Sequence, residues 1–502
     1  MTQERTSLPE VVERLIDPEV ASLRVVTDST ATVGRPIRVT VQACNEIGAT
    51  ARDGAGVVPL VLMGPTGHAK VGEALVEDGL GHAQLEVGAA GVYRVEALLN
   101  EQLRAVSDPL EIGSGEPERS LYWGDIHSHI RERRAQAMIS DAEMLMGPPT
   151  VEEALRWARD VGAVHFAAVT DHDSLLTDAE WAETIEAHRR LNEDGRFVTF
   201  PGYEWGSSRG ISGNYGHRHV IFRRNRARGV EPVPLLRSRE SGTSTPPALH
   251  AALRATVPID DVLLVPHHTA RAGSALWMDW QYSDPELERC CEVFSIWGSS
   301  EKMGEPWPIK YLASGGYFGA SEARGHHLQD GLARGWRFGF TGGSEAHDGR
   351  PSRPLIHGSH VIAETEFLAP PGITGVWAES LTRDGIFDAL RARRCYATTG
   401  ARIIVRFNLN TAAGDTPMGG EVSAAALEGP VELTAEVIGT APIASCELVK
   451  NNREIDRASS GGSELRDQLR DSDAARPGDY YYLRVTQADG EMAWASPIFV
   501  TG

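Results

Sequence analysis

Residues 150–173 read TVEEALRWARDVGAVHFAAVTDHD, and they set the predicted architecture of the central part of the chain. Thr150 and Glu153 form a capping box, in which the two side chains satisfy free backbone amides at the start of a helix. Behind this box, apolar residues recur at helical spacing on one face and charged residues occupy the other. Gly162 is placed to end the helix, and an apolar strand is predicted directly after it, over 164–170.

The same alternation of helices and strands continues further along the chain. A second helix is predicted over 178–191, and further strands are predicted over 197–200, 220–222, 262–265, 293–296 and 338–341. Alternation of this kind favours parallel strands with helices outside them. The prediction for residues 119–400 is therefore an α/β domain built as a closed or nearly closed parallel β/α barrel.

Both flanking segments have the two-residue period of strands instead. Apolar and polar residues alternate over 37–42, 93–97 and 431–437, and turn signals such as Asp53-Gly54 and Asp489-Gly490 separate such runs. We expect an N-terminal segment with an all-β sandwich domain in residues 1–118 and a second all-β sandwich domain in residues 401–502. The polar residues 459–477 are predicted to form a long surface loop.

Composition limits the class of protein. The chain has 69 Asp plus Glu against 49 Lys plus Arg, a net charge of −20, whereas binding to a nucleic acid relies on an excess of cations. No apolar run approaches the roughly 20 residues that a membrane-spanning helix needs, and the cysteines form no C-x-x-C pair. We expect a cytoplasmic protein with a small-molecule substrate and with no nucleic-acid or membrane partner. Assembly into a homo-oligomer is left open.

Histidines and acids of the kinds that bind metal ions stand at the ends of the predicted strands. At the carboxyl ends of parallel strands such side chains would converge on one face, although they are far apart in the sequence. Imidazole and carboxylate groups without thiolate suit zinc, manganese or iron. The candidates are Asp125, His127, His129, Asp171, His172, Asp173, Glu204, His217, His219, His267, His268, Glu292, Glu345, His347 and Asp348.

Each candidate taken alone has an ordinary structural explanation, such as a helix cap or a solvated strand end. Taken together, so many imidazoles and carboxylates could be buried only at a large desolvation cost, which a cation would offset. Other histidines are expected to be structural: His165 packed inside its strand and His188 on the surface. No nucleophile elbow, phosphate-binding loop or H-E-x-x-H motif competes with a metal site.

Several stretches around these residues resemble a known superfamily. The segments GDIHSH (124–129), AVTDHD (168–173), PGYEW (201–205), GHRHVIF (216–222), VPHH (265–268) and GGSEAHDGRP (342–351) follow in the order and spacing of the polymerase-and-histidinol-phosphatase (PHP) superfamily of metal-dependent hydrolases. Within it, the sequence looks most like the CehA/McbA-like metallohydrolases, the group named after carbaryl hydrolase. The resemblance implies a PHP-type distorted parallel β/α barrel over about 120–400.

The resemblance also implies two or three divalent metal ions, zinc, manganese or iron. The ligands that it implies for a first metal are His127, His129, Glu204 and Glu345. Glu204 would bridge to a second metal, held by His217 or His219 and by His267 or His268, with the pattern favouring His217 and His268. His172 and His347 would serve a third position or surround the ligands. The final motif of the superfamily usually has Asp at the position of Glu345. A histidine that often completes a third metal site is absent here, and Asp141 is the candidate to replace it.

The implied chemistry is hydrolysis. Two cations that share Glu204 would lower the pKa of a bridging water and supply hydroxide at neutral pH. Arg218, Arg271 or Arg350 would neutralise the developing anion, and His172 or Asp171 would pass a proton to the leaving group. The predicted function is a divalent-metal-dependent hydrolase of a small ester-type substrate, either a carboxylic or carbamate ester or amide, or a phosphoester.

Two other functions are weighed against this one. The first is a non-enzymatic binding or scaffold protein with a degenerate PHP barrel, which the nearly complete set of ligands disfavours. The second is a PHP phosphoesterase acting on nucleotides or nucleic acid, which the charge of −20 and the lack of a basic stripe disfavour.

Overall fold

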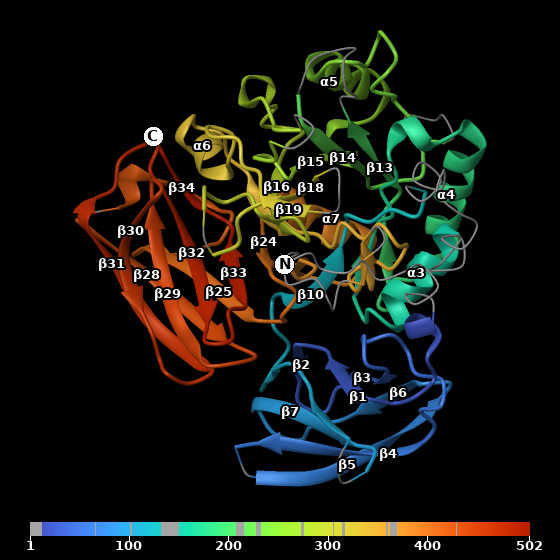
Figure 1. The fold of residues 1–502 in the computed structure, drawn as a ribbon. Coiled ribbons are helices and arrows are strands. Elements are labelled where there is room, and N and C mark those ends of the chain that lie inside the picture. The colour runs from blue at the N-terminus through green and yellow to red at the C-terminus, as the bar shows by residue number, and fades with distance from the viewer. Residues whose placement is uncertain are drawn as a thin grey trace.

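The structure, a computed structural model, describes residues 13–65, 67–100, 103–131, 150–206, 215–226, 232–272, 276–304, 306–313, 317–357, 360–361, 369–427 and 429–502. In Figure 1 an N-terminal β region, in blue, lies below a central region of strands and helices, and a C-terminal β region, in red, lies beside the central one. Within the described residues, no helix combines the length and the apolar character that crossing a bilayer requires.

The N-terminal region is one hydrogen-bonded sheet with the strand order β1-β3-β6-β5-β4-β7-β9-β2, and β8 pairs with β7. As the alternation predicts, β7 buries Tyr93, Val95 and Ala97 and turns the residues between them outward. Its strands are β1 Ser22–Thr27, β2 Thr30–Thr32, β3 Ile37–Cys44, β4 Gly56–Gly64, β5 Gly67–Glu77, β6 Leu80–Leu85, β7 Gly91–Leu98, β8 Arg104–Val106 and β9 Leu110–Gly113.

The C-terminal region packs two layers of strands face to face. The sheet β26-β25-β28-β31 shares one core with β29 and β32–β34, in which Leu433 and Leu469 meet Leu448 and Leu483. The strands are β25 Ile404–Asn410, β26 Thr416–Pro417, β27 Glu421–Ser423, β28 Pro430–Ile438, β29 Ile443–Lys450, β30 Arg453–Ala458, β31 Glu464–Ala474, β32 Tyr480–Gln487, β33 Met492–Ala495 and β34 Ile498–Thr501, with the 3₁₀ turn η7 Ala424–Ala426.

One prediction for this region is confirmed and one is wrong. Asp489-Gly490 forms the hairpin turn between β32 and β33, with Thr486 opposite Met492 and with Gly490 at a φ of 89°. The predicted surface loop over 459–477 is wrong, because most of it forms strand β31. Leu465 and Leu469 anchor that strand in the core, and the polar residues between them face outward.

Both predicted helices form within the predicted limits. Helix α3 (Val151–Asp160) is capped by Thr150, which accepts from the Glu153 amide, and α4 (Asp178–Leu191) begins at a complete capping box of Thr177 and Glu180. His188, predicted on the surface, is instead fully buried on α4. Further helices are α5 Pro246–Thr256, α6 Leu328–Ala333 and α7 Arg383–Arg391, with 3₁₀ turns η2 Asp173–Leu175, η3 Ile259–Asp261 and η5 Trp280–Tyr282.

The predicted PHP-type distorted parallel β/α barrel for residues 119–400 is wrong. Among the described strands of that range, parallel pairing joins only β10-β11-β12 and β16 with β20, and isolated parallel bridges join Ser128 to Ala346 and His172 to Glu204. The pairs β13-β14, β14-β15, β10-β23 and β23-β24 are antiparallel. The central strands are β10 Ser120–Asp125, β11 Phe166–Ala167, β12 Val198–Thr199, β13 Gly202–Gly206, β14 His217–Phe222, β15 Val262–His267, β16 Cys290–Ser295, β17 Gly298–Ser299, β18 Lys310–Ala313, β19 Tyr317–Ala320, β20 Gly339–Gly342, β21 Ile356–His357, β22 His360–Val361, β23 Ile373–Ala378 and β24 Cys395–Thr398.

The reason for the failure lies in the connections. A parallel pair needs a crossover of a dozen or more residues, usually a helix, whereas β13 and β14 are joined by the short segment 207–216. Helices join the parallel strands over 120–200 and join β16 to β20, but the strands between and after these segments pair antiparallel. In addition, β24 pairs with β33, so one sheet runs from β12 in the central region to β30 in the C-terminal region.

Candidate metal centre

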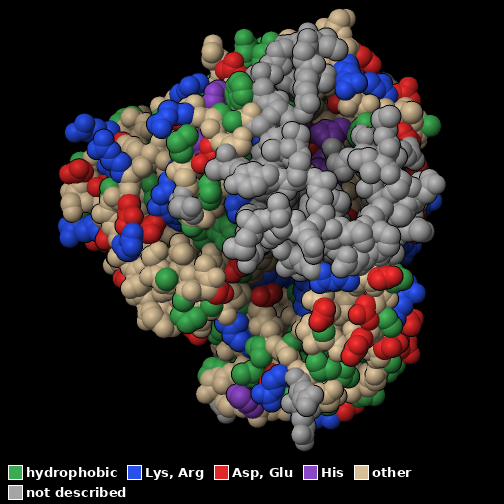
Figure 2. All heavy atoms as spheres, in the orientation of Figure 1, with side chains coloured by type: hydrophobic (Ala, Val, Ile, Leu, Met, Phe, Trp, Pro, Cys, Tyr) green, Lys and Arg blue, Asp and Glu red, His purple; other side chains and the backbone are tan. Residues whose placement is uncertain are grey.

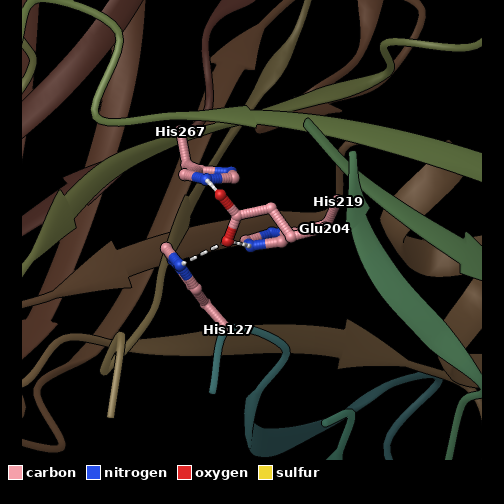
Figure 3. A group of neighbouring side chains, drawn as sticks. All are labelled: His127, Glu204, His219 and His267. Atoms are coloured by element: carbon pink, nitrogen blue, oxygen red, sulfur yellow. Dashed lines mark ion pairs between the residues drawn. The ribbon is translucent and has the colours of Figure 1, made fainter. Parts of the chain in front are cut away.

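Imidazoles from four parts of the chain surround the carboxylate of Glu204 on β13. His127 and His129 follow β10, His172 precedes η2, His217 and His219 lie on β14, and His267 ends β15. A ring nitrogen of each of these six lies within 4.0 Å of a Glu204 carboxylate oxygen. Figure 3 shows His127, His219 and His267 directed at Glu204. The convergence expected from the sequence is therefore present, although the barrel is not.

The two oxygens of Glu204 face different sets of imidazoles. Oε1 contacts His217 Nδ1 and lies 3.1 Å from His267 Nε2 and 3.4 Å from His172 Nδ1. Oε2 lies 3.2 Å from His129 Nε2, 3.8 Å from His127 Nε2 and 4.0 Å from His219 Nε2. Imidazole nitrogens gather at both oxygens of Glu204. This is the arrangement of a carboxylate that bridges two cations.

Antiparallel register brings these residues together. Glu204 on β13 is the direct partner of His219 on β14, and His217 is the partner of His267 on β15. His217 and His219 are two residues apart, so both side chains project from the same face of β14. The carboxyl ends of β13 and β15 therefore meet the amino end of β14 at one edge of this small sheet.

The described residues contain four sets whose candidate ligand atoms lie within 4.8 Å of one another. Three of the sets share Glu204, and the fourth joins His127 to two further acids. The sets are His127, Glu204, His219 and His267; Glu204, His217, His267 and His268; His129, His172 and Glu204; and His127, Glu292 and Glu345. These groups could hold metal ions.

Several buried ring nitrogens support a fit to a cation. His127 Nε2, both nitrogens of His219 and His267 Nε2 are buried and make no hydrogen bond within the described part of the chain. Leaving such groups unsatisfied costs about 1–3 kcal/mol each. A divalent ion would satisfy them, because neutral imidazole nitrogen is a preferred ligand of zinc and related metals.

Electrostatics point the same way. Burial, reinforced by neighbouring imidazoles, lowers the pKa of His127 and of His219 well below the ordinary value, and burial lowers the pKa of His217 to about 4. These rings therefore keep a free lone pair at neutral pH. Burial and nearby carboxylates raise the pKa of Glu292 well above its ordinary value. A cation placed among these groups would relieve the repulsion between the acids.

Backbone conformation is unusual at two residues beside the cluster. His268 and Glu345 have φ angles of 32° and 47°, which residues other than glycine rarely adopt. Glu345 accepts a hydrogen bond from Ser295 Oγ at 2.9 Å, and its other carboxylate oxygen lies 3.7 Å from His268 Nε2. Strained conformations of this kind concentrate at functional sites, where the surrounding structure holds them in place.

The structure brings one of the three candidate arginines to the cluster. Arg271 lies over the Trp297 ring at 3.9 Å, with its Nη1 4.0 Å from Glu345 Oε1. Arg218 projects from the opposite face of β14 to His217 and His219, and its Nε donates to Glu288 at 2.6 Å. Arg350 donates to Asp348 at 2.9 Å and lies over Trp157. Strand alternation thus removes Arg218 from the centre.

Of the two predicted proton carriers, Asp171 and His172, only His172 lies at the cluster. Asp171 accepts hydrogen bonds from the backbone amides of Ile130 and Arg131, each at 2.8 Å, and from the Arg131 guanidinium. It therefore holds the segment that follows His129 and does not face Glu204. His172, in contrast, stacks on His129 with ring centroids 5.0 Å apart and has a side chain 20% exposed.

Other predicted residues lie at the periphery or outside the described residues. His347, like His172, stacks on His129, with ring centroids 5.0 Å apart. Asp141 lies outside the described residues. In Figure 2 histidine side chains are visible in the central region, between atoms drawn in grey.

Some residues that the sequence pattern offers as alternatives lie together in the structure. His217 and His219 both reach Glu204, and His267 and His268 occupy one candidate set. The H-x-H spacing on a strand was the signal for the first pair. Glu292 is a candidate from its position at a strand start alone, and the structure places it against His127. No sequence signal specified that contact.

Comparison with known proteins gives one family match. Residues 161–303 and 338–418 match the model of a family described as a protein of unknown function (DUF3604). These segments include Glu204, the strand pair with His217 and His267, and Glu345. The match therefore covers much of the candidate centre but not the segment with His127 and His129.

Curated relatives and solved structures extend this picture. Uncharacterized proteins of Chlamydia trachomatis serovar D and Chlamydia pneumoniae are 29% and 26% identical to this chain over 82% of its length. The chain spans 62% of the length of each of these relatives. A crystal structure from Bacteroides vulgatus, of a two-domain protein containing a predicted PHP-like metal-dependent phosphoesterase, is similar with a TM-score of 0.33 and 12% identity, covering 76% of this chain and 96% of that one.

Proposed function

We propose that this protein is a divalent-metal-dependent hydrolase of a small ester-type substrate. The observation that carries the proposal is the position of Glu204, whose two carboxylate oxygens each face a separate group of imidazoles. A buried carboxylate surrounded by imidazoles has few other uses, because a structural role would leave the unsatisfied ring nitrogens of His127, His219 and His267 buried at a cost.

Two cation positions follow from the geometry. His127, His219 and His267 would hold one ion with Glu204, and His217 and His268 would hold the second, with Glu204 shared. His129 and His172 form a further set on the side that is partly exposed. Divalent cations in such a site polarise a substrate oxygen and lower the pKa of a water molecule. Zinc, manganese and iron all suit these donors.

The chain's own residues would act on the substrate around these positions. Arg271, held over Trp297 beside Glu345, supplies a guanidinium that favours an anionic oxygen. His172 is the partly exposed imidazole at the centre, so it is placed to hold a proton for the leaving group. Arg218 and Asp171, which face other partners, are not part of this proposal.

The substrate is proposed only by class. The bond would be a carboxylic or carbamate ester, an amide or a phosphoester of a small molecule, and the excess of acids over bases disfavours nucleic acid. The domain limits, a location in the cytoplasm and any homo-oligomer remain predictions of the sequence. A scaffold protein that has lost catalysis is the rival function.

The first test is the metal content of the purified protein, followed by stripping with a chelator and reloading with zinc, manganese or iron. We expect bound metal and metal-dependent turnover of aryl carboxylic esters or aryl phosphates. His127→Ala should lose metal and activity, because it removes one ring facing Glu204. His250→Ala is the matched control, since it removes a buried imidazole on α5 that belongs to none of the four candidate sets.

The outcomes separate the candidates. Metal binding without turnover of either substrate class would favour the scaffold, and turnover of phosphates alone would select the phosphoesterase. A wild-type protein that binds none of the three metals would overturn the proposal.

A further inference from the structure

A second buried glutamate contacts the cluster from the side away from Glu204. Glu292, on β16, has a relative exposure of 2%, and its Oε2 lies 2.9 Å from His127 Nδ1. The other ring nitrogen of His127, Nε2, faces Glu204 Oε2 at 3.8 Å. Nε2 also lies 3.9 Å from Glu345 Oε1, so the two ring nitrogens are directed at different carboxylates, Nδ1 at Glu292 and Nε2 at Glu204 and Glu345.

The two nitrogens of His127 cannot play the same role. A nitrogen that binds a metal must present its lone pair, so the ring proton of a neutral His127 has to sit on Nδ1. Nδ1–H then donates to Glu292, whereas Nε2 faces the centre. A carboxylate in this position fixes both the tautomer and the orientation of a metal-binding imidazole.

The backbone around Glu292 makes room for this contact. A Cβ atom added at Gly343 would overlap Glu292 Oε2 and His127 Cβ. Gly343 follows β20, which pairs with β16, and its amide donates to Phe294 O at 3.0 Å. Any side chain here would separate Glu292 from His127, so the absence of a Cβ at this position is a condition for the pair.

We infer that Glu292 is a positioning residue, which acts through His127 to aim Nε2 at the metal centre, and that Gly343 keeps the space this pair needs. The inference rests on the proposed function, because it requires a metal at the Glu204 cluster. The alternative role for Glu292 is that of a direct metal ligand, because it forms a candidate set with His127 and Glu345. The inference assigns it the positioning role instead.

The test compares Zn²⁺ affinity, measured by competition with a chromophoric chelator, in wild type, Glu292→Gln and Gly343→Ala. Loss of an outer partner of a metal-binding histidine costs about 10- to 100-fold in metal affinity. We expect a loss in this range for Glu292→Gln and a comparable loss for Gly343→Ala, which alters no ionisable group. Far-UV circular dichroism and thermal unfolding report whether each variant is folded.

Glu288→Gln is the matched control. Glu288 is also buried and precedes the same strand, but it accepts from Arg218 on the side away from the cluster. The same change of charge at this position should alter stability while leaving the Zn²⁺ affinity of the folded protein within about twofold of wild type. An equal loss of affinity in Glu288→Gln would overturn the inference, because any buried charge change would then suffice.

A double-mutant cycle separates positioning from direct ligation. If Glu292 acts through His127, Glu292→Gln should cause no further loss of Zn²⁺ affinity in a His127→Ala background. Full additivity of the two losses would overturn the inference and make Glu292 a ligand. Unchanged affinity in Glu292→Gln alone would overturn it while leaving the metal hydrolase intact. A wild-type protein that does not bind Zn²⁺ or the other metals would instead remove the proposed function.

Discussion

At the scale of single residues, the centre depends on a few side chains whose partners are far away in the sequence. Glu204 contacts residues from 127 to 267, and Glu345 takes a positive φ that places its carboxylate near Arg271. Each of these residue types has ordinary chemistry when it is exposed to water. In the centre, neighbouring residues desolvate each side chain and supply opposite charge, and these two effects shift the pKa values of carboxylates and imidazoles.

Arg271 offers a prediction at this scale. Arg271→Met should lower kcat by about 100-fold, the size of effect seen when one donor to a developing oxyanion is removed. Metal content should stay at the wild-type level, because a guanidinium carries no lone pair for a cation. Steady-state kinetics and elemental analysis of the same preparation check both parts.

The comparison variant is Arg350→Met. Its guanidinium pairs with Asp348 and lies over Trp157, away from the Glu204 cluster. We expect its kcat to stay near that of wild type. If Arg271→Met lost metal as well as activity, Arg271 would be supporting Glu345 rather than acting on substrate.

At the scale of elements, strand pairing and helix packing place the site. The β13-β14-β15 sheet brings its ligands to one edge through antiparallel register. Helix α4 stands behind the central strands, and its His188 donates from Nδ1 to Thr184 O at 2.7 Å, while Nε2 faces the Val169 amide at 3.4 Å. Through these two contacts the fully buried ring links the helix to the segment leading to His172.

The pH dependence of stability follows from His188. Burial lowers its pKa from 6.5 to about 4. Its contribution is therefore complete above the unfolded-state pKa of 6.5 and is lost as the pH falls through about 4, since the folded protein resists protonation. A shift of this size corresponds to roughly 3 kcal/mol.

The measurement is urea unfolding of wild type and His188→Gln at pH 7.5 and at pH 4.5. Between these values wild type should lose roughly 2 to 3 kcal/mol more of its unfolding free energy than the variant, which cannot be protonated there. Equal losses would mean that the ring is already solvated in the folded state.

At the scale of the whole molecule, the central and C-terminal regions share structure. The pairing of β24 with β33 continues one sheet across both. Beside it, Glu301 accepts from Tyr482 Oη and Arg484 Nη1, each at 2.6 Å, and from Trp494 Nε1 at 2.8 Å. A buried carboxylate of the central region is thus held by three groups of the C-terminal one.

Removing that charge tests how the regions unfold. Glu301→Gln should destabilise the protein by about 1–3 kcal/mol, because it weakens the buried hydrogen bonds from Tyr482 and Arg484, although Arg484 keeps Glu447 as a second partner. Since the sheet is continuous, we expect circular dichroism and the loss of enzymatic activity to follow one transition in urea. The exposed pair of Glu454 with Arg457 provides the control, and Glu454→Gln should change little. Two separate transitions in wild type would contradict this coupling.

The sequence by itself determined local structure and the inventory of the site. Helices α3 and α4, the alternating strands of the flanking regions and the Asp489-Gly490 turn follow from capping, periodicity and turn chemistry within short windows. The residue types around His127, Glu204 and His267 are specified in the same local way. Only the tertiary structure decided that β13-β14-β15 is antiparallel, that Arg218 and Asp171 face away, and that Glu292 meets His127. These outcomes depend on which strands pair and on side-chain contacts between distant segments, and no local pattern encodes either.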